Sequence, residues 1–310
     1  MLVWELIGAA VGAGFASGRE IAVFFAQYGK WSYAALAASG ATLMLAAEPI
    51  PSRWKNCFAE KVWNSLLALL LIVTGGAMLA GAGEIAAQTM AYRGSKWIGM
   101  SATLLIGWML AVKTKTGLAW VSRVLVAAML LLLLLAFRIQ PMEGAVIAKS
   151  EWPMALLSGI SYGGFNAALQ WPVFLSSPLE RKRKKCALVA AATAMLLMLS
   201  LGQTLLKRNA ALMGEVMPFL VLMKQFGKTG YAGFIFCLYL AVLSTLTACI
   251  RAVNGRVLPV ALIVLVSVGG FGDVVNWLYP ILGGACCIIL IIAKITNSFA
   301  GSFLSKNDML

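Results

Sequence analysis

Long apolar runs, separated by short charged or Pro/Gly-containing breaks, recur along the whole of this chain. Residues 124–137 and 281–293, with their flanks, approach the roughly 20 apolar residues that a membrane-spanning helix needs. Charged residues make up only 12% of the sequence and the mean hydropathy is +0.89, which argues against a soluble globular chain. Because lipid offers no hydrogen bonds to the backbone, these runs are expected to cross the membrane as α-helices.

The runs predict an all-α integral membrane protein of about ten transmembrane helices, in a single domain over residues 1–310. A further apolar segment at 217–226 is too short to cross and is expected to be interfacial or re-entrant. The sequence shows no basic segment followed by an apolar run and a small-residue cleavage site, so no secretory signal peptide is expected. The predicted spans are 2–27, 31–50, 62–90, 96–112, 117–138, 152–177, 186–206, 229–253, 256–274 and 276–297.

The distribution of basic residues favours cytoplasmic positions for both termini. In that orientation 15 of the 25 Lys and Arg residues lie at the cytoplasmic side, nine lie outside, and Arg19 lies within a span. The run at 181–185, with five adjacent basic residues, strongly resists translocation. The net charge of +14 is therefore attributed to the positive-inside rule, and no nucleic-acid partner is expected.

The residues and motifs that many enzymes and metal-binding proteins need are missing from this sequence. Histidine is absent, and no GxSxG, Walker A or HExxH pattern occurs. The six cysteines form no CxxC pair, which argues against a zinc site or a disulfide framework. The chain is not expected to be an enzyme, and no cofactor is expected beyond a coupling ion.

Four glycines interrupt the first predicted span, and each costs a helix roughly 1 kcal/mol relative to alanine. They are Gly8, Gly12, Gly14 and Gly18. Non-helical backbone at membrane depth occurs only where protein or a water-filled cavity surrounds it, and a broken helix there indicates a transporter's binding site. Gly12 and Gly14 are therefore predicted to line a substrate pocket with non-helical backbone. The alternative is that the small residues only allow close helix packing.

A second candidate break, Ser161-Tyr-Gly-Gly-Phe-Asn166, lies in the sixth span. Each break begins a block of five spans, so the blocks, at about 1–138 and 152–297, are predicted to be inverted repeats. Two opposed sets of helix ends at the midplane suit a substrate carboxylate and a cation. The alternatives are a coincidence of two glycine pairs, and ordinary interhelical hydrogen bonds for the polar side chains. The candidate substrate contacts in this span are Tyr162, Gly163, Asn166 and Gln170.

Two carboxylates at membrane depth, Glu20 and Glu84, are the candidate proton carriers in a chain without histidine. Such groups are costly and usually face a cavity or a partner. Arg19 adjoins Glu20, but neighbouring side chains on a helix diverge by about 100°, so the two are not expected to pair.

Residues 7–21, followed by Phe24-Phe25 and Tyr28-Gly29, resemble the opening of the YkvI-like membrane proteins of the amino acid–polyamine–organocation superfamily. That resemblance implies the LeuT-type fold of five plus five inverted spans, with helices 1 and 6 broken. It also implies alternating-access transport, often of amino acids, in the bacterial inner membrane.

The resemblance also implies one sodium site, formed by carbonyls of the first-helix break and by an A-x-x-[ST]-[ST] pattern on span eight. The matching positions are Gly8, Val11, Ala241, Ser244 and Thr245. Alternatively, the Ser244 and Thr245 hydroxyls bond back to carbonyls of their own helix. Ala9 and Phe15 replace the asparagines of a first sodium site, so a single Na⁺ or a proton is expected.

The sequence thus predicts a secondary active transporter in the cell membrane that moves a small organic solute, an amino acid or related amine, by Na⁺- or H⁺-coupled symport. Its expected partners are that solute and the lipid bilayer, and its oligomeric state is left open. One alternative is a non-transporting small-molecule sensor of the same fold. A channel-like or structural membrane subunit is another. The absence of a soluble sensor domain or long tail in this sequence favours transport.

Overall fold

A computed structural model describes residues 2–10, 12–45, 58–90, 92–113, 118–142 and 151–307, and these residues form helices without strands. The first predicted span comprises α1 (Leu2–Ala10), α2 (Ala13–Ser17) and α3 (Arg19–Phe24), and the 3₁₀ segment η1 (Ala26–Trp31) follows. The next elements are α4 (Ser32–Leu45), α5 (Phe58–Thr89), α6 (Ser95–Lys113), α7 (Leu118–Ala136), α8 (Trp152–Ser176) and α9 (Arg181–Arg208). The last are η3 (Ala210–Leu212), α10 (Pro218–Met223), η4 (Lys224–Phe226), α11 (Gly227–Ala252), α12 (Val257–Val268), α13 (Phe271–Asp273), the π-helical η5 (Val274–Leu278) and α14 (Tyr279–Asn307).

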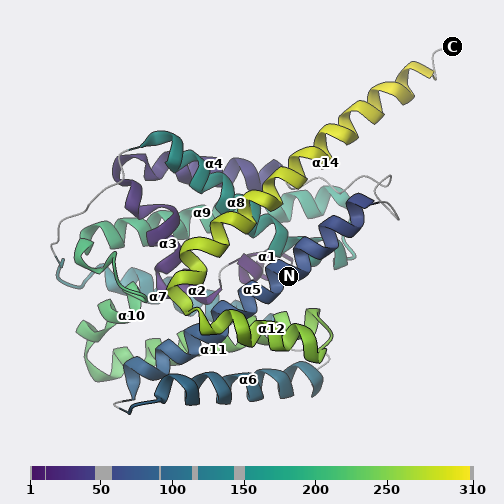
Figure 1. The fold of residues 1–310 in the computed structure, drawn as a ribbon. Helices are drawn as coiled ribbons and strands as arrows, with labels where there is room; N and C mark the ends of the chain where they lie inside the picture. The colour runs from purple at the N-terminus through teal and green to yellow at the C-terminus, as the bar shows by residue number, and fades with distance from the viewer. Residues whose placement is uncertain are drawn as a thin grey trace.

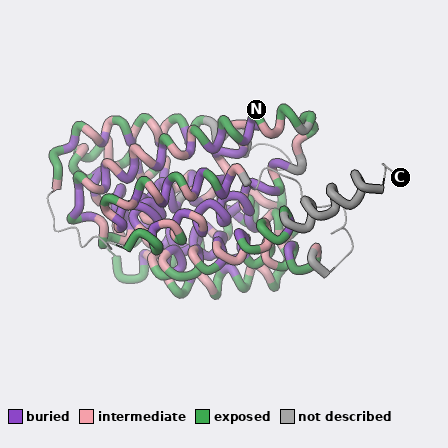
Figure 2. Tube along the Cα trace, turned by 90° about the horizontal axis from the view of Figure 1, so that it is seen from above, coloured by how far each residue is buried: buried purple, intermediate pink, exposed green. Residues whose placement is uncertain are grey.

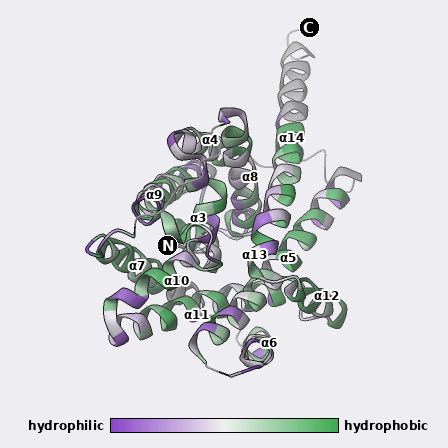
Figure 3. Ribbon diagram, turned by 60° about the vertical axis from the view of Figure 1, so that its left-hand side comes forward, coloured by the Kyte–Doolittle hydropathy of each residue, from purple (hydrophilic) through white to green (hydrophobic). Residues whose placement is uncertain are grey.

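Apolar helices long enough to cross a membrane are present, as predicted. In the described residues they are Glu60–Thr89, Ser95–Lys113, Lys182–Arg208, Pro218–Ala252 and Phe271–Lys294. Large apolar side chains also cover outer surfaces, for example Trp97, Leu105 and Trp108 on α6, and Figure 3 shows apolar residues on outward-facing helices. Lipid explains so many exposed apolar side chains better than water does. The full number of spans, the inverted repeat and the cytoplasmic termini stay predictions.

Helix α8 packs against both α4 and α14. Helix α1 contacts α7, α8 and α9, while α5 contacts α6, α11 and α12 (Figure 1). Buried residues concentrate between these helices, and the exposed positions lie on the outside of the bundle (Figure 2). The first span therefore lies among other helices, where its irregular backbone is shielded from lipid.

The predicted break in the sixth span is wrong, because α8 is one continuous helix across Ser161–Asn166. Its glycines serve close packing instead. A Cβ on Gly163 would lie 2.7 Å from the Ser39 carbonyl oxygen of α4, and one on Gly164 would collide with the Gly283 carbonyl of α14. Close packing of small residues, the alternative considered for the first span, thus occurs in α8. Gly163 accordingly faces α4 and has regular helical backbone.

Replacing Gly163 by Leu should separate α4 from α8, because the new side chain overlaps Ser39 and Thr42. Overpacking of this kind costs about 1–3 kcal/mol or more. We expect a lower melting temperature for the purified protein in detergent. Gly233→Leu on α11 is the control, since nothing lies within 4 Å of a Cβ there. Equal melting temperatures for the two variants would contradict this account of α8.

Candidate functional site

The first span is interrupted at Gly12, as predicted. Helix α1 ends at Ala10, and Gly12 has extended backbone (φ −86°, ψ −169°) before α2 begins. Gly14, in contrast, lies inside α2, so the expectation of non-helical backbone there is wrong. The Ala16 N–H donates to the Gly12 carbonyl at 3.1 Å, which closes a helical turn around Gly14. The lack of a Cβ at Gly14 serves a different purpose, namely the close approach of Glu20.

A second interruption at Gly18 separates α2 from α3. Gly18 has a left-handed backbone (φ 82°), and a Cβ there would lie 2.9 Å from the Phe219 ring of α10. The Ser17 hydroxyl donates to the Gly14 carbonyl at 2.9 Å and accepts from the Arg19 N–H at 3.2 Å. This turn changes the course of the chain so that α3 places Glu20 over α2. The glycine-rich stretch predicted irregular backbone here, although no separate role was predicted for Gly18.

The Glu20 carboxylate is buried at this turn, with only 4% of the residue exposed. One carboxylate oxygen, Oε1, lies so close to Gly14 that any Cβ there would overlap it. The other oxygen, Oε2, accepts a hydrogen bond of 3.3 Å from the Tyr162 hydroxyl of α8. In the described part of the chain the carboxylate has no further hydrogen-bond partner and no ion pair.

Arg19 does not neutralise Glu20, as expected from their positions on the helix. Its guanidinium donates to the Asn276 side-chain oxygen of η5 from Nε (3.1 Å) and Nη2 (2.9 Å). Nη1 donates to the Glu215 carbonyl at 2.9 Å. Arg19 therefore joins the first span to η5 and to the segment before α10. These contacts were not predictable from the sequence, because they connect residues far apart in the chain.

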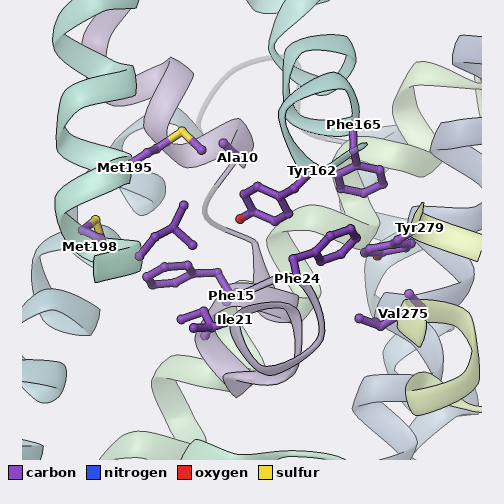
Figure 4. Close-up of a cluster of buried hydrophobic side chains, with 14 of the residues drawn as sticks. Ala10, Phe15, Ile21, Phe24, Tyr162, Phe165, Met195, Met198, Val275 and Tyr279 are labelled. Carbon is purple, nitrogen blue, oxygen red and sulfur yellow. The ribbon is translucent and has the colours of Figure 1, made fainter. Parts of the chain in front are cut away.

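Aromatic rings surround the Glu20–Tyr162 contact. The Tyr162 ring lies 5.0 Å from Phe24 and 4.9 Å from Phe25, measured between centroids, and Phe165 stacks on Tyr279 at 4.3 Å. Figure 4 shows Tyr162 projecting from α8 toward the α2–α3 region, between Ala10 and Phe24. The carboxylate thus lies in a largely apolar environment, where an unpaired charge is costly.

Of the other two polar side chains predicted to contact substrate from the sixth span, only one lies near the Glu20–Tyr162 contact. Asn166 is buried one turn from Tyr162 and donates to its backbone carbonyl at 3.0 Å, while its side-chain oxygen has no partner. Gln170 lies eight residues from Tyr162, about 12 Å along the helix. It donates to the Met195 sulfur at 3.2 Å and lines a separate small pocket with Trp171 and other apolar residues.

Glu84 is not part of this cluster. It is half-buried on α5, and its carboxylate accepts a hydrogen bond of 3.1 Å from Gln88 on the same helix. No other polar contact of Glu84 occurs in the described residues. Of the two candidate proton carriers, the structure therefore brings only Glu20 to the broken span.

The predicted sodium ligands are brought together in part. The Thr245 hydroxyl of α11 lies 3.6 Å from the position of a Cβ on Gly12, so span eight faces the break. The Ser244 hydroxyl donates to the Ala241 carbonyl, three residues earlier on the same helix, at 3.0 Å. The alternative of a bond within the helix therefore holds for Ser244, although the bond was expected four residues earlier. Gly8 lies in the last turn of α1, whose carbonyls lack an intrahelical partner. Val11 lies outside the described residues.

The chain is similar to the "uncharacterized membrane protein YkvI" of Bacillus subtilis (strain 168), with 27% identity over 204 residues. The match covers 59% of this chain and 58% of that relative, so the chain spans a little over half of the relative's length. No profile of a known protein family matches the chain. The similarity supports the YkvI-like resemblance and agrees with the apolar helices in identifying a membrane protein. The wider superfamily and its fold stay predictions.

The contact between Glu20 and Gly14 gives a sharp test of this site. Gly14→Ala places a methyl group on the carboxylate, so we expect Glu20 to be displaced and the affinity for any solute that binds this carboxylate to fall at least tenfold, or about 1.4 kcal/mol. Gly12→Ala is the matched control, because its Cβ meets Thr245 only at ordinary van der Waals distance. Thermal-shift titrations of both variants with a panel of amino acids and amines measure the difference. Similar affinities for Gly14→Ala and Gly12→Ala would contradict a role of the Glu20 carboxylate in ligand binding.

Proposed function

We propose that this chain is a secondary active transporter for a small organic solute that carries an ammonium group, an amino acid or a related amine. The observation that carries the proposal is the Glu20 carboxylate, buried at the broken first span with one neutral hydrogen-bond donor. A carboxylate removed from water is stable as an anion only beside a cation. The ammonium group of the solute supplies that cation.

The position of the carboxylate also supports transport. Glu20 is attached to a short helix, α3, that is bounded by irregular backbone at Gly18 and at Phe25. Together with Gly12, these residues divide the first span into short segments that can tilt separately. Such a segment gives the solute access from alternate sides without movement of the whole bundle.

Two coupling ions are compatible with this site. A single Na⁺ would use the carbonyls at the end of α1 with the Ser244 and Thr245 hydroxyls. Ser244 donates its proton to Ala241, which leaves its oxygen lone pairs for a cation. Alternatively, a proton is carried on Glu20.

Uptake into proteoliposomes tests the function directly. The purified chain is reconstituted and offered radiolabelled amino acids and their decarboxylated amines, with Na⁺ and pH gradients varied separately. We expect concentrative uptake of at least one ammonium compound, and loss of that uptake in Glu20→Gln, which keeps the shape of the side chain but removes its charge. Binding of a compound without any uptake would favour the sensor and contradict transport.

The coupling ion is tested with paired variants in the same assay. If Na⁺ is the driver, the double change Ser244→Ala and Thr245→Ala removes two of roughly five oxygen ligands and should abolish sodium stimulation. If a proton is the driver, that change should matter little, uptake by the unaltered protein should follow the pH gradient, and Glu20→Asp, which keeps a titratable carboxyl, should keep that dependence. Glu84→Gln is the matched carboxylate control, because Glu84 already has Gln88 as a partner. Sodium-independent uptake by the unaltered protein would exclude the sodium version.

A further inference from the structure

The surroundings of Glu20 limit what can neutralise it. Five elements pack against α3, namely α2, η1, α8, α9 and η5. The titratable groups that face the carboxylate are Tyr162 of α8 and, from the start of α14, Tyr279, which is within electrostatic range of it. Both are neutral phenols, so neither supplies a positive charge.

Three basic residues of these elements make contacts elsewhere. Lys207 of α9 donates to the Ser32 hydroxyl at 2.6 Å, and Lys30 of η1 lies over the Trp31 ring. Arg19, on α3 itself, bonds to Asn276 of η5. In the described part of the chain, none of these charges contacts the Glu20 carboxylate.

The hydrogen bond from Tyr162 does not substitute for a cation. At 3.3 Å it is longer than the 2.5–2.7 Å of a strong hydroxyl-to-carboxylate bond. The opposite oxygen is pressed against Gly14, and no hydrogen bond between these two residues occurs in the described part of the chain. The charge of Glu20 is therefore neutralised by a proton on the carboxylate or by a bound cation, and the ammonium group of the proposed solute is such a cation.

We propose that a proton and the ammonium group of the solute occupy the Glu20 carboxylate alternately, so that the chain exchanges one for the other across the membrane. The inference rests on the proposed transport function and specifies its coupling. Binding follows RNH₃⁺ + Glu20–COOH → RNH₃⁺·Glu20–COO⁻ + H⁺, in which charge and atoms balance. The proton removes the negative charge that the ammonium requires, so the two cannot be bound together. Protons then leave in exchange for the solute, in contrast to the expected symport.

Proton release on binding tests this exchange without a membrane. The full chain in detergent is titrated calorimetrically with ethanolamine and with alanine, in Na⁺-free buffers that differ in ionisation enthalpy, over a range of pH. We expect one proton released per ammonium bound where the free carboxyl is protonated, and affinity that falls tenfold for each pH unit of acidification there. Tyr162→Phe should still release the proton, because the carboxyl remains.

The variants identify the group responsible. Glu20→Gln should lose the pH dependence and the proton release, whereas Glu84→Gln should keep both. Melting temperatures establish that each variant is folded, and Glu20→Asp replaces Glu20→Gln if the latter is unfolded, with the expectation that proton release persists at reduced affinity. Whether a proton is released on ammonium binding is measured directly on the unaltered protein, so this result does not depend on the folding of any variant.

Three results would overturn the exchange: affinity independent of pH, a folded Glu20→Gln that keeps the pH dependence of the unaltered chain, or no binding of either probe. Uptake in proteoliposomes without proton release would leave the transport function standing while this inference fails. Proton release on binding without uptake would overturn the transport function and support only alternate occupancy of Glu20.

Discussion

The backbone of a membrane protein has no hydrogen-bond partners in lipid, and the arrangement of this chain follows from that constraint. The irregular residues of the first span, Gly12 and Gly18, are tolerated because α8, α9, α10 and α11 pack against α1, α2 and α3. The regular helices that surround this span each satisfy their own backbone. The bundle therefore encloses its least regular segment, and the buried carboxylate is attached to that segment.

Glycine has two roles in this structure that the sequence cannot separate. Both predicted breaks were glycine-rich stretches in apolar spans, yet only the first is broken. At Gly163 and Gly164 the neighbours of the helix are the carbonyls of Ser39 and Gly283, and the missing side chains allow them to approach. Which role a glycine has depends on what lies opposite it, and that is settled by tertiary packing rather than by local sequence.

Helix positions followed from hydropathy with good accuracy, since burial in lipid is a property of each segment by itself. The site was predictable in parts. The break and the depth of Glu20 marked Gly12 and Glu20 as candidates, and Tyr162 was selected for its place in the sixth span. Their contact was not predictable, because it depends on how α3 crosses α8. Glu84 had the same sequence signal as Glu20, but it is half-buried on α5, away from the broken span, and accepts a hydrogen bond from Gln88.

The asymmetry between the two predicted breaks has a mechanical consequence. Helix α8 is continuous and is held by carbonyl contacts of Gly159 to α4 and Gly164 to α14, so it resists bending near Tyr162. The first span is divided at Gly12 and Gly18, and the part that carries Glu20 is only six residues long. Movement that opens the site is therefore expected in α2 and α3, with Tyr162 as the fixed partner. Loss of the Glu20–Tyr162 bond costs little because it is long, whereas movement of an unneutralised carboxylate through apolar surroundings costs much more. In the proposed exchange, a proton or an ammonium on Glu20 removes that larger cost, and neutralisation of this one side chain is then the condition for the movement.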